Sequence, residues 1–370
     1  MASFSIIALG AIGVAGFYLM PLIVGAAAQS LSLDPTQQGL VASAELAGMT
    51  LSSLAAISWV NRVSLRTQTS AGLALLVLGN ALSAAAAGVE SLVVLRLATG
   101  LGGGVVLAAA MAALAAQSNT DRVFGYLVAA EYGVAALGFV ALPPVVAQHG
   151  LRGIFLALAT FCVCGAPLIR FLPRAAMAKL PDDPGAAPAR GSALANLAAI
   201  AAFSIGFSGV WAYAERIGSG AGLLPQVIGN ALALCSVMSV LGALAVAWQG
   251  QRLRRTSLAT LALAAQLVSL FALTGDLGWL RYATAFGLLS FFWNVTFPVM
   301  FSGMAELDRS GRWVVSGSVA AFAGTAAGPV MAGSLRAAGG ESMLTYFGAL
   351  WMLICWVALL ASDRLRLDAG

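Results

Sequence analysis

Charged residues and histidine are scarce in this sequence. Of 370 residues, 19 are Lys or Arg, 14 are Asp or Glu, and one is His. Hydrolytic triads and most transition-metal sites need histidine beside other polar side chains, and His149 stands alone in a loop between two apolar stretches. No Ser/His/Asp set or metal-ligand cluster is visible. The sequence therefore predicts that the protein is not an enzyme and holds no metal or other cofactor.

The cysteines form no recognisable metal or redox motif, and the sequence has no nucleotide-binding motif. The four cysteines all lie inside apolar stretches: Cys162, Cys164, Cys235 and Cys355. The Cys-Val-Cys spacing at 162–164 is not that of zinc ligands, and buried cysteine commonly packs as a small hydrophobic residue. The chain also lacks the Gly-x-x-x-x-Gly-Lys-[Ser/Thr] phosphate loop. We therefore expect no metal or redox centre and no direct use of ATP.

Long apolar stretches dominate the sequence instead. Hydrophobic residues make up 60% of the chain, and the mean hydropathy is +0.93, which excludes a soluble globular domain. A hydrocarbon core about 30 Å thick needs roughly 20 apolar residues per helix. The stretches that meet this requirement are 4–28, 37–60, 68–88, 91–116, 122–147, 151–172, 193–217, 223–249, 255–275, 277–304, 311–337 and 341–362. The sequence predicts an all-α membrane protein with 12 transmembrane helices.

One polar gap divides these stretches into two equal sets. Residues 173–192 are rich in proline and charge, as expected for a flexible cytoplasmic linker. Residues 1–172 and 193–370 then form an N-terminal and a C-terminal six-helix bundle. An even number of spans gives both bundles the same orientation, so we expect them to be related by a pseudo-two-fold axis along the membrane normal.

Arginine and lysine predict the orientation in the membrane. When alternate loops are assigned to one side, 14 of the 19 basic residues fall on the side of the termini and the linker. We expect both termini to be cytoplasmic, in a multi-pass protein of the bacterial cytoplasmic (inner) membrane. The first stretch lacks a positive leading segment, so we interpret it as a retained helix. The net charge of +5 reflects this topology and does not indicate nucleic-acid binding.

The two halves also echo one another in sequence. Residues 95–100, Leu-Arg-Leu-Ala-Thr-Gly, return at 280–285 as Leu-Arg-Tyr-Ala-Thr-Ala. Weaker matches follow in the same order: Gly16-Phe17 with Gly206-Phe207, Leu33 with Leu223, Pro35 with Pro225, Gly39 with Gly229, Arg62 with Arg252, and Asp121-Arg122 with Asp308-Arg309. Duplicated membrane proteins are usually transporters.

Two motifs resemble those of the major facilitator superfamily (MFS), a family of six plus six helices around a central cavity. Asn-Arg-Val-Ser-Leu-Arg at 61–66 is similar to the family's cytoplasmic loop Gly-x-x-x-Asp-Arg-x-Gly-Arg-Lys. Arg62 and Arg66 match, Asn61 replaces the acid, and both glycines are missing. Arg96 with Gly100 and Gly102 is similar to the family's Arg motif in helix 4. The antiporter Gly-Pro motif has only loose equivalents in helix 5.

The resemblance implies secondary transport by alternating access, in which the two halves rock around a mid-membrane site. It also implies that Asn61, Arg62 and Arg66 belong to a conformational-gate loop. Because this loop departs from the family pattern, we expect it to lock the outward-facing state less firmly.

Charged residues inside the spans are the candidates for proton coupling, because each costs a few kcal/mol on insertion scales. Glu45 and Arg96 lie at similar depths, with Gly100 and Gly103 on the arginine's helix face, which predicts an ion pair between closely packed helices. Arg96 either tunes Glu45 for proton transfer or forms a static pair with it.

Glu131 lies deeper in its span and has no basic residue near it in sequence. An unpaired carboxyl there could carry a proton near neutral pH, or it could form a neutral structural hydrogen bond. Its repeat counterpart is Phe322, and that of Glu45 is Cys235, so both acids are confined to the N-terminal half.

Candidate solute contacts lie mainly in the C-terminal half. Ser204, Ser208, Trp211 and Glu215 form one stripe of helix 7, and Tyr18 is the helix-1 counterpart of Ser208. The resemblance implies that helices 1 and 7 line the cavity. Trp211 and Tyr213 could instead be interfacial aromatics, and we expect Glu215 to be solvated.

Helix 10 supplies a further candidate patch. Pro298 frees the carbonyl of Asn294 beside Trp293, which suits a planar organic solute, although kinks without ligands are common. Arg281, the sequence echo of Arg96, could attract an organic anion or anchor the helix at the interface.

Together these features predict a secondary transporter of a small organic solute, coupled to protons through Glu45 or Glu131. The solute is expected to be amphipathic, such as an aromatic organic acid. Alternatives are a drug/proton antiporter that exports hydrophobic compounds and a non-transporting membrane receptor of the same fold. We expect a monomer in the lipid bilayer that binds no nucleic acid.

Overall fold

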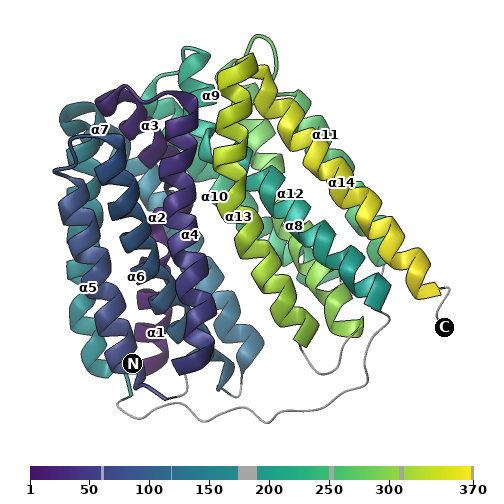
Figure 1. Cartoon of the computed structure of the whole chain (residues 1–370), viewed down its shortest axis with the longest axis horizontal. Helices are drawn as coiled ribbons and strands as arrows, with labels where there is room; N and C mark the ends of the chain where they lie inside the picture. The colour runs from purple at the N-terminus through teal and green to yellow at the C-terminus, as the bar shows by residue number, and fades with distance from the viewer. Residues whose placement is uncertain (60–61, 118, 174–189, 250–253, 308–311, 368–370) are drawn as a thin grey trace. The chain divides into compact units, whose positions relative to one another are not determined.

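The computed structural model describes residues 1–59, 62–117, 119–173, 190–249, 254–307 and 312–367. The chain divides into two compact units, Met1–Leu180 and Pro181–Gly370. The regular elements of the described residues are helices, which run lengthwise within each unit (Figure 1). The predicted all-α membrane class is confirmed, since each of the twelve predicted stretches coincides with one or more helices.

The first unit contains spans one to six. Its first span is broken into α1 (Ala2–Gly13), α2 (Ala15–Tyr18) and α3 (Met20–Leu31), because the backbone leaves the helical region at Val14 and Leu19. The remaining elements are α4 (Pro35–Trp59), α5 (Leu65–Ser83), α6 (Val89–Ala115), α7 (Thr120–Gly165) and the 3-10 helix η1 (Ala166–Phe171). α7 holds spans five and six, which meet at Gly150, whose φ of 55° is in the left-handed region that favours glycine.

The second unit contains spans seven to twelve. Its elements are α8 (Arg190–Ala212), α9 (Ala214–Gly220), α10 (Pro225–Gln249), α11 (Arg255–Phe271), α12 (Trp279–Leu307), α13 (Arg312–Gly339) and α14 (Ser342–Leu367). Span seven consists of α8 and α9, which are separated by a break at Tyr213. In the part of the chain that is described, eight helices are long and apolar enough to cross a membrane, and three shorter apolar helices accompany them.

Glycines on α6 determine how closely the helices of the first unit pack. A Cβ at Gly100 would collide with the backbone carbonyl of Glu45 on α4, and a Cβ at Gly103 would collide with the carbonyl of Gly13 on α1. Small residues allow this backbone contact in a bilayer, where helices gain little from the hydrophobic effect. The close approach predicted from Gly100 and Gly103 is confirmed.

Gly100→Val is therefore expected to force α4 and α6 apart and to lower the apparent melting temperature in detergent. Overpacking a tight contact typically costs about 1–3 kcal/mol. Gly133→Val is the matched control, because a Cβ at Gly133 meets no atom within 4 Å. Equal melting temperatures for the two variants would contradict the close packing of α4 on α6.

The helix starts determine the register of the repeat. α4 and α10 begin at Pro35 and Pro225, α5 and α11 at Leu65 and Arg255, and α6 and α12 at Val89 and Trp279, so each pair is 190 residues apart. The sequence match between 95–100 and 280–285 pairs Arg96 with Arg281, which is only 185 residues away. In the structure, Arg96 therefore corresponds to Phe286, and the predicted pairing of Arg96 with Arg281 is wrong by more than one helical turn.

Candidate functional site

Arg96 lies in the centre of a polar cluster inside the first unit. Its side chain is fully buried, and its Nη1 is 3.5 Å from the Oε2 atom of Glu45. The guanidinium also lies over the ring of Phe155, at 4.2 Å from the centroid. Its Nη2 has four acceptors within 2.7–3.2 Å: Gly79 O, Asn80 Oδ1, Ser83 Oγ and Thr99 Oγ1. The predicted ion pair is confirmed, whereas no sequence pattern indicated that polar groups on α5 would join it.

This cluster explains how a buried arginine is tolerated. A buried ion pair is stable only when further hydrogen bonds satisfy the remaining donors. Asn80 and Ser83 lie one turn apart on α5 and provide this support, while the Nε of Arg96 has no partner. Most of the donor capacity of Arg96 is thus used within the bundle and is not available to a solute.

Glu131 forms a second buried acidic site with the broken first span. The Tyr18 hydroxyl donates to its Oε2 atom at 2.9 Å. Glu131 itself is 8% exposed, and the Tyr132 ring lies edge-on to Tyr18 at 5.0 Å between centroids. The sequence leaves Glu131 either as an unpaired carboxyl that carries a proton or in a neutral structural hydrogen bond, and it makes Tyr18 a candidate solute contact. The structure joins these two residues, which are 113 positions apart, in one hydrogen bond.

Glu45 and Glu131, the buried acids described in the first unit, both contact the four-residue helix α2. Tyr18 at its end binds Glu131, and Gly16 lies so close to Glu45 that a Cβ there would collide with the Oε1 atom. Breaks at Val14 and Leu19 flank this helix. Irregular backbone at membrane depth is tolerated where it is buried or lines a cavity, and it commonly occurs at binding sites.

The second unit carries a column of aromatic rings between α8 and α12. Trp293 stacks on Phe207 and Phe203, with centroids 4.1 and 4.8 Å apart, and on Phe297 at 5.0 Å. Phe207 stacks on Trp211 at 6.0 Å. We call this set the aromatic ladder: Phe203, Phe207, Trp211, Trp293, Phe297 and Phe301. The structure thus joins Trp211 and Trp293, and the four-residue spacing of the aromatics in each helix was the signal that could have predicted the ladder.

Two polar candidates of this unit bind their own helices. The Asn294 amide donates to the carbonyl of Ser290 at 3.0 Å, and Ser208 donates to Ile205 at 3.4 Å. Such bonds to the preceding turn are common for these side chains within helices. The predicted patch of Trp293 with Asn294 therefore has a ring stacked in the ladder and an amide bonded to α12.

Glu215 is not solvated, contrary to the prediction. It is 6% exposed, and its Oε2 atom has no hydrogen-bond partner. Tyr213 is also buried, and its hydroxyl donates to the carbonyl of Pro329 at 3.2 Å, so Tyr213 is not an interfacial aromatic. The reason is the break at Tyr213, after which Tyr282 of α12 donates to the carbonyl of Ala214 at 2.8 Å and holds α9 in the unit.

Arg281 and the predicted gate loop lie at helix ends. The exposed Arg281 donates to the carbonyls of Thr274 and Asp276 at 2.7 and 3.1 Å, which fits its interpretation as an anchor. Arg66 donates to the carbonyls of Arg170 and Leu172 and thereby joins α5 to the end of span six. Arg62 is exposed, and Asn61 lies outside the described residues.

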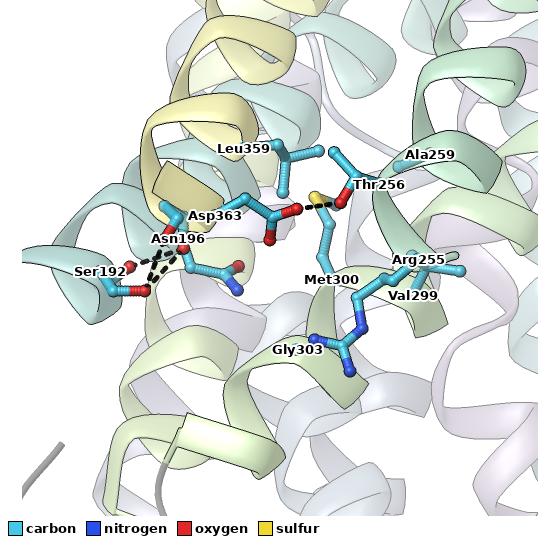
Figure 2. A pocket seen from close by; sticks show the side chains of 11 residues that line it. Ser192, Asn196, Arg255, Thr256, Ala259, Val299, Met300, Gly303, Leu359 and Asp363 are labelled. Carbon is cyan, nitrogen blue, oxygen red and sulfur yellow. Dashed lines mark hydrogen bonds between the residues drawn. The ribbon is translucent and has the colours of Figure 1, made fainter. Parts of the chain in front are cut away.

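Side chains of α8, α11 and α14 contact one another in the second unit, as Arg66 contacts the end of span six in the first unit. Thr256 at the start of α11 bonds to Asp363 near the end of α14, and Ser192 of α8 donates to the carbonyl of Ser362 at 2.9 Å (Figure 2). Asn196 lines the same pocket. Because these groups mostly bind each other, the pocket is a junction that ties spans seven, nine and twelve together.

These features define a class of protein: a duplicated, multi-span membrane protein with buried acids beside a broken helix, as in secondary transporters. The family model described as Major Facilitator Superfamily matches residues 5–312, and the chain belongs to this family of membrane transporters. No match to a curated protein sequence is found.

Solved structures share the fold. A D-xylose-proton symporter is 12% identical, with a TM-score of 0.77 over 98% of this chain and 96% of that chain. A mutant of the peptide transporter POT is 13% identical, with a TM-score of 0.79 over 98% and 94% of the two chains. The same mutant in complex with sulfate gives a TM-score of 0.78 at 13% identity and the same coverage. At these identities the likeness concerns the fold alone.

Proposed function

We propose that this transporter moves a small amphipathic solute by alternating access and couples the movement to protons through Glu131. The observation that carries the proposal is the hydrogen bond from Tyr18 to Glu131 beside the broken first span. A carboxyl in this place gains or loses a proton as its surroundings alternate between dry and wet. Among the described residues, no Lys or Arg forms an ion pair with it.

The role proposed for Glu45 is structural and differs from that of Glu131. It is paired with Arg96 and touches α2 at Gly16, so its charge is tied to the position of the same short helix that carries Tyr18. A shift of α2 would disturb both acids together. We propose that Glu131 carries the proton and that the Glu45–Arg96 pair holds α2 in position.

The solute is proposed to be an amphipathic aromatic compound, with an organic acid as the first candidate. The aromatic ladder supports the ring. A proton carried with a monoanion adds no net charge to the loaded transporter, so the membrane potential does not oppose their joint movement. Arg96 and Arg281 do not support the anion, because both guanidinium groups bind acceptors within the protein. We further propose a monomer with both termini cytoplasmic in a bacterial inner membrane.

Uptake into proteoliposomes tests the coupling. Naphthalene-2-sulfonate is a suitable probe, since it is planar, amphipathic and permanently ionised. With the potential clamped, an inward proton gradient is expected to raise its accumulation several-fold. Glu45→Gln/Glu131→Gln should lose this response, and Glu90→Gln is the control because Glu90 is exposed.

Three outcomes would contradict the proposal. Unchanged gradient-driven uptake in the double variant would exclude both acids as coupling groups. Solute loss from the vesicles under the same gradient would indicate an antiporter. Binding of the probe without any flux would indicate a receptor.

A further inference from the structure

A groove opens between the first turns of α10 and α12 in the second unit. Its volume is about 320 Å³. It is lined by Val227, Asn230, Ala231 and Leu234 of α10 and by Trp279 and Ala283 of α12. Binding sites for small molecules usually have volumes of about 300–1,000 Å³. The groove is therefore large enough to hold a small organic molecule.

The groove forms because α10 and α12 are further apart near their starts. Deeper in the span, a Cβ at Gly242 of α10 would collide with the carbonyl of Phe291 of α12. One turn nearer the helix starts, a Cβ at Gly287 would lie 3.5 Å from the Met238 side chain, an ordinary contact. Gly48, the first-unit counterpart of Met238, lies directly against the backbone of α6. A side chain thus takes the place of glycine on the side of the groove.

The groove is polar at one end and apolar at the other. Asn230 and Trp279, which is 59% exposed, lie nearest the helix starts, and Leu234 and Ala283 follow one turn deeper. The Oδ1 atom of Asn230 accepts from Gln226 at 3.0 Å. Within the described part of the chain, the amide nitrogen of Asn230 and the indole nitrogen of Trp279 donate no hydrogen bond. Two neutral donors are therefore available at the polar end.

This arrangement suits an amphipathic anion. A carboxylate or sulfonate group accepts hydrogen bonds from both N–H donors, and an apolar body covers Leu234 and Ala283. The side chains that line the groove carry no charge. Both helices begin at this end, and the partial positive charge of helix N-termini adds to the preference for an anion.

The two donors are specific to the second unit. In the register of the helix starts, Asn230 corresponds to Leu40 and Trp279 to Val89, so the first unit has apolar side chains at both positions. The fold does not require an amide or an indole here. A feature found in only one copy of a repeat points to a role specific to that copy.

We propose that this groove is a binding site for the solute, in which Asn230 and Trp279 recognise its anionic group and Leu234 and Ala283 contact its apolar body. The inference rests on the proposed function, because it locates the anion recognition that neither Arg96 nor Arg281 supplies. The site is separate from the aromatic ladder, which lies between α8 and α12.

Calorimetry with naphthalene-2-sulfonate tests the groove on the purified full chain in detergent, without a proton gradient. Asn230→Leu/Trp279→Phe removes both donors and should weaken binding by at least about tenfold, because hydrogen bonds to charged groups are the stronger ones. Leu234→Trp fills the apolar end and should weaken binding to a similar degree. The protonated 2-naphthylmethylamine, a cation with the same ring, should bind about tenfold more weakly than the sulfonate.

Matched controls lie further along the same helix. Leu244→Trp and Trp248→Phe alter exposed residues of α10 that do not line the groove. Both should retain the affinity to within about twofold, as expected for surface substitutions. Melting temperatures of all variants, measured in the same detergent, show whether a lost affinity reflects lost folding.

The outcomes separate this inference from the proposed function. No binding of the sulfonate, unchanged affinity in Leu234→Trp, or equal affinity for the cation would each overturn the groove as an anion site. Displacement of the sulfonate by phosphatidylglycerol in mixed micelles would make the groove a lipid site and would also overturn the proposal. Groove-dependent binding without proton-driven uptake would support the site and contradict only the proposed coupling.

Discussion

Glu131→Gln is expected to abolish proton-driven accumulation of naphthalene-2-sulfonate and to leave solute exchange intact. The amide keeps the size of the side chain and can still accept from Tyr18, but it cannot release a proton. A carrier that no longer needs to lose a proton can still alternate while loaded with solute. The loss of accumulation should be at least tenfold, in the range of lost acid–base groups.

Two measurements on the same proteoliposomes check this result. Uptake under an imposed pH gradient reports coupling, and counterflow at equal pH reports exchange. Tyr18→Phe is the companion variant, because it removes only the hydroxyl that donates to Glu131. We expect it to shift the pH dependence of uptake while accumulation persists. If Glu131→Gln accumulates solute normally, Glu131 is not the coupling group; if it loses exchange as well, its role is structural.

Arg96→Met is expected to destabilise the first unit by about 3–5 kcal/mol, the usual cost of leaving one member of a buried ion pair alone. Glu45 would remain 3% exposed without its cation, and the polar groups of Asn80 and Ser83 would lose their donor. An apparent melting temperature lower by roughly 5–10 °C in detergent would report this loss.

Two further variants make the stability test specific. Arg281→Met removes an exposed arginine and should change the free energy of unfolding by no more than about 0.5 kcal/mol. Glu45→Leu/Arg96→Met removes both charges and should recover much of the stability lost in Arg96→Met, since a buried ion pair can often be replaced by apolar residues. A stable Arg96→Met variant, or an equally unstable Arg281→Met variant, would contradict the assignment of Arg96 as the arginine whose buried ion pair stabilises the first unit.

The pairing of Glu45 with Arg96 was predictable because both lie at a similar depth in spans that the glycines of α6 bring together. The partner of Glu131 was not predictable, because no sequence pattern links residue 131 to residue 18. The aromatic ladder was predictable only in part. Its rings recur every four residues in each helix, but only packing shows that Phe207 and Trp293 meet face to face.

Hydropathy and internal repetition determined the class of this protein, since a bilayer demands long apolar helices whatever their mutual contacts. The sequence also led to Glu45, Arg96, Glu131, Trp211 and Trp293 as residues of interest. Tertiary structure alone decided which groups they meet: Tyr18 for Glu131, the α5 polar groups for Arg96, and burial for Glu215. The physical reason is that hydropathy depends on composition along one helix, whereas hydrogen bonds and ring stacking depend on the rotation and register of helices far apart in sequence.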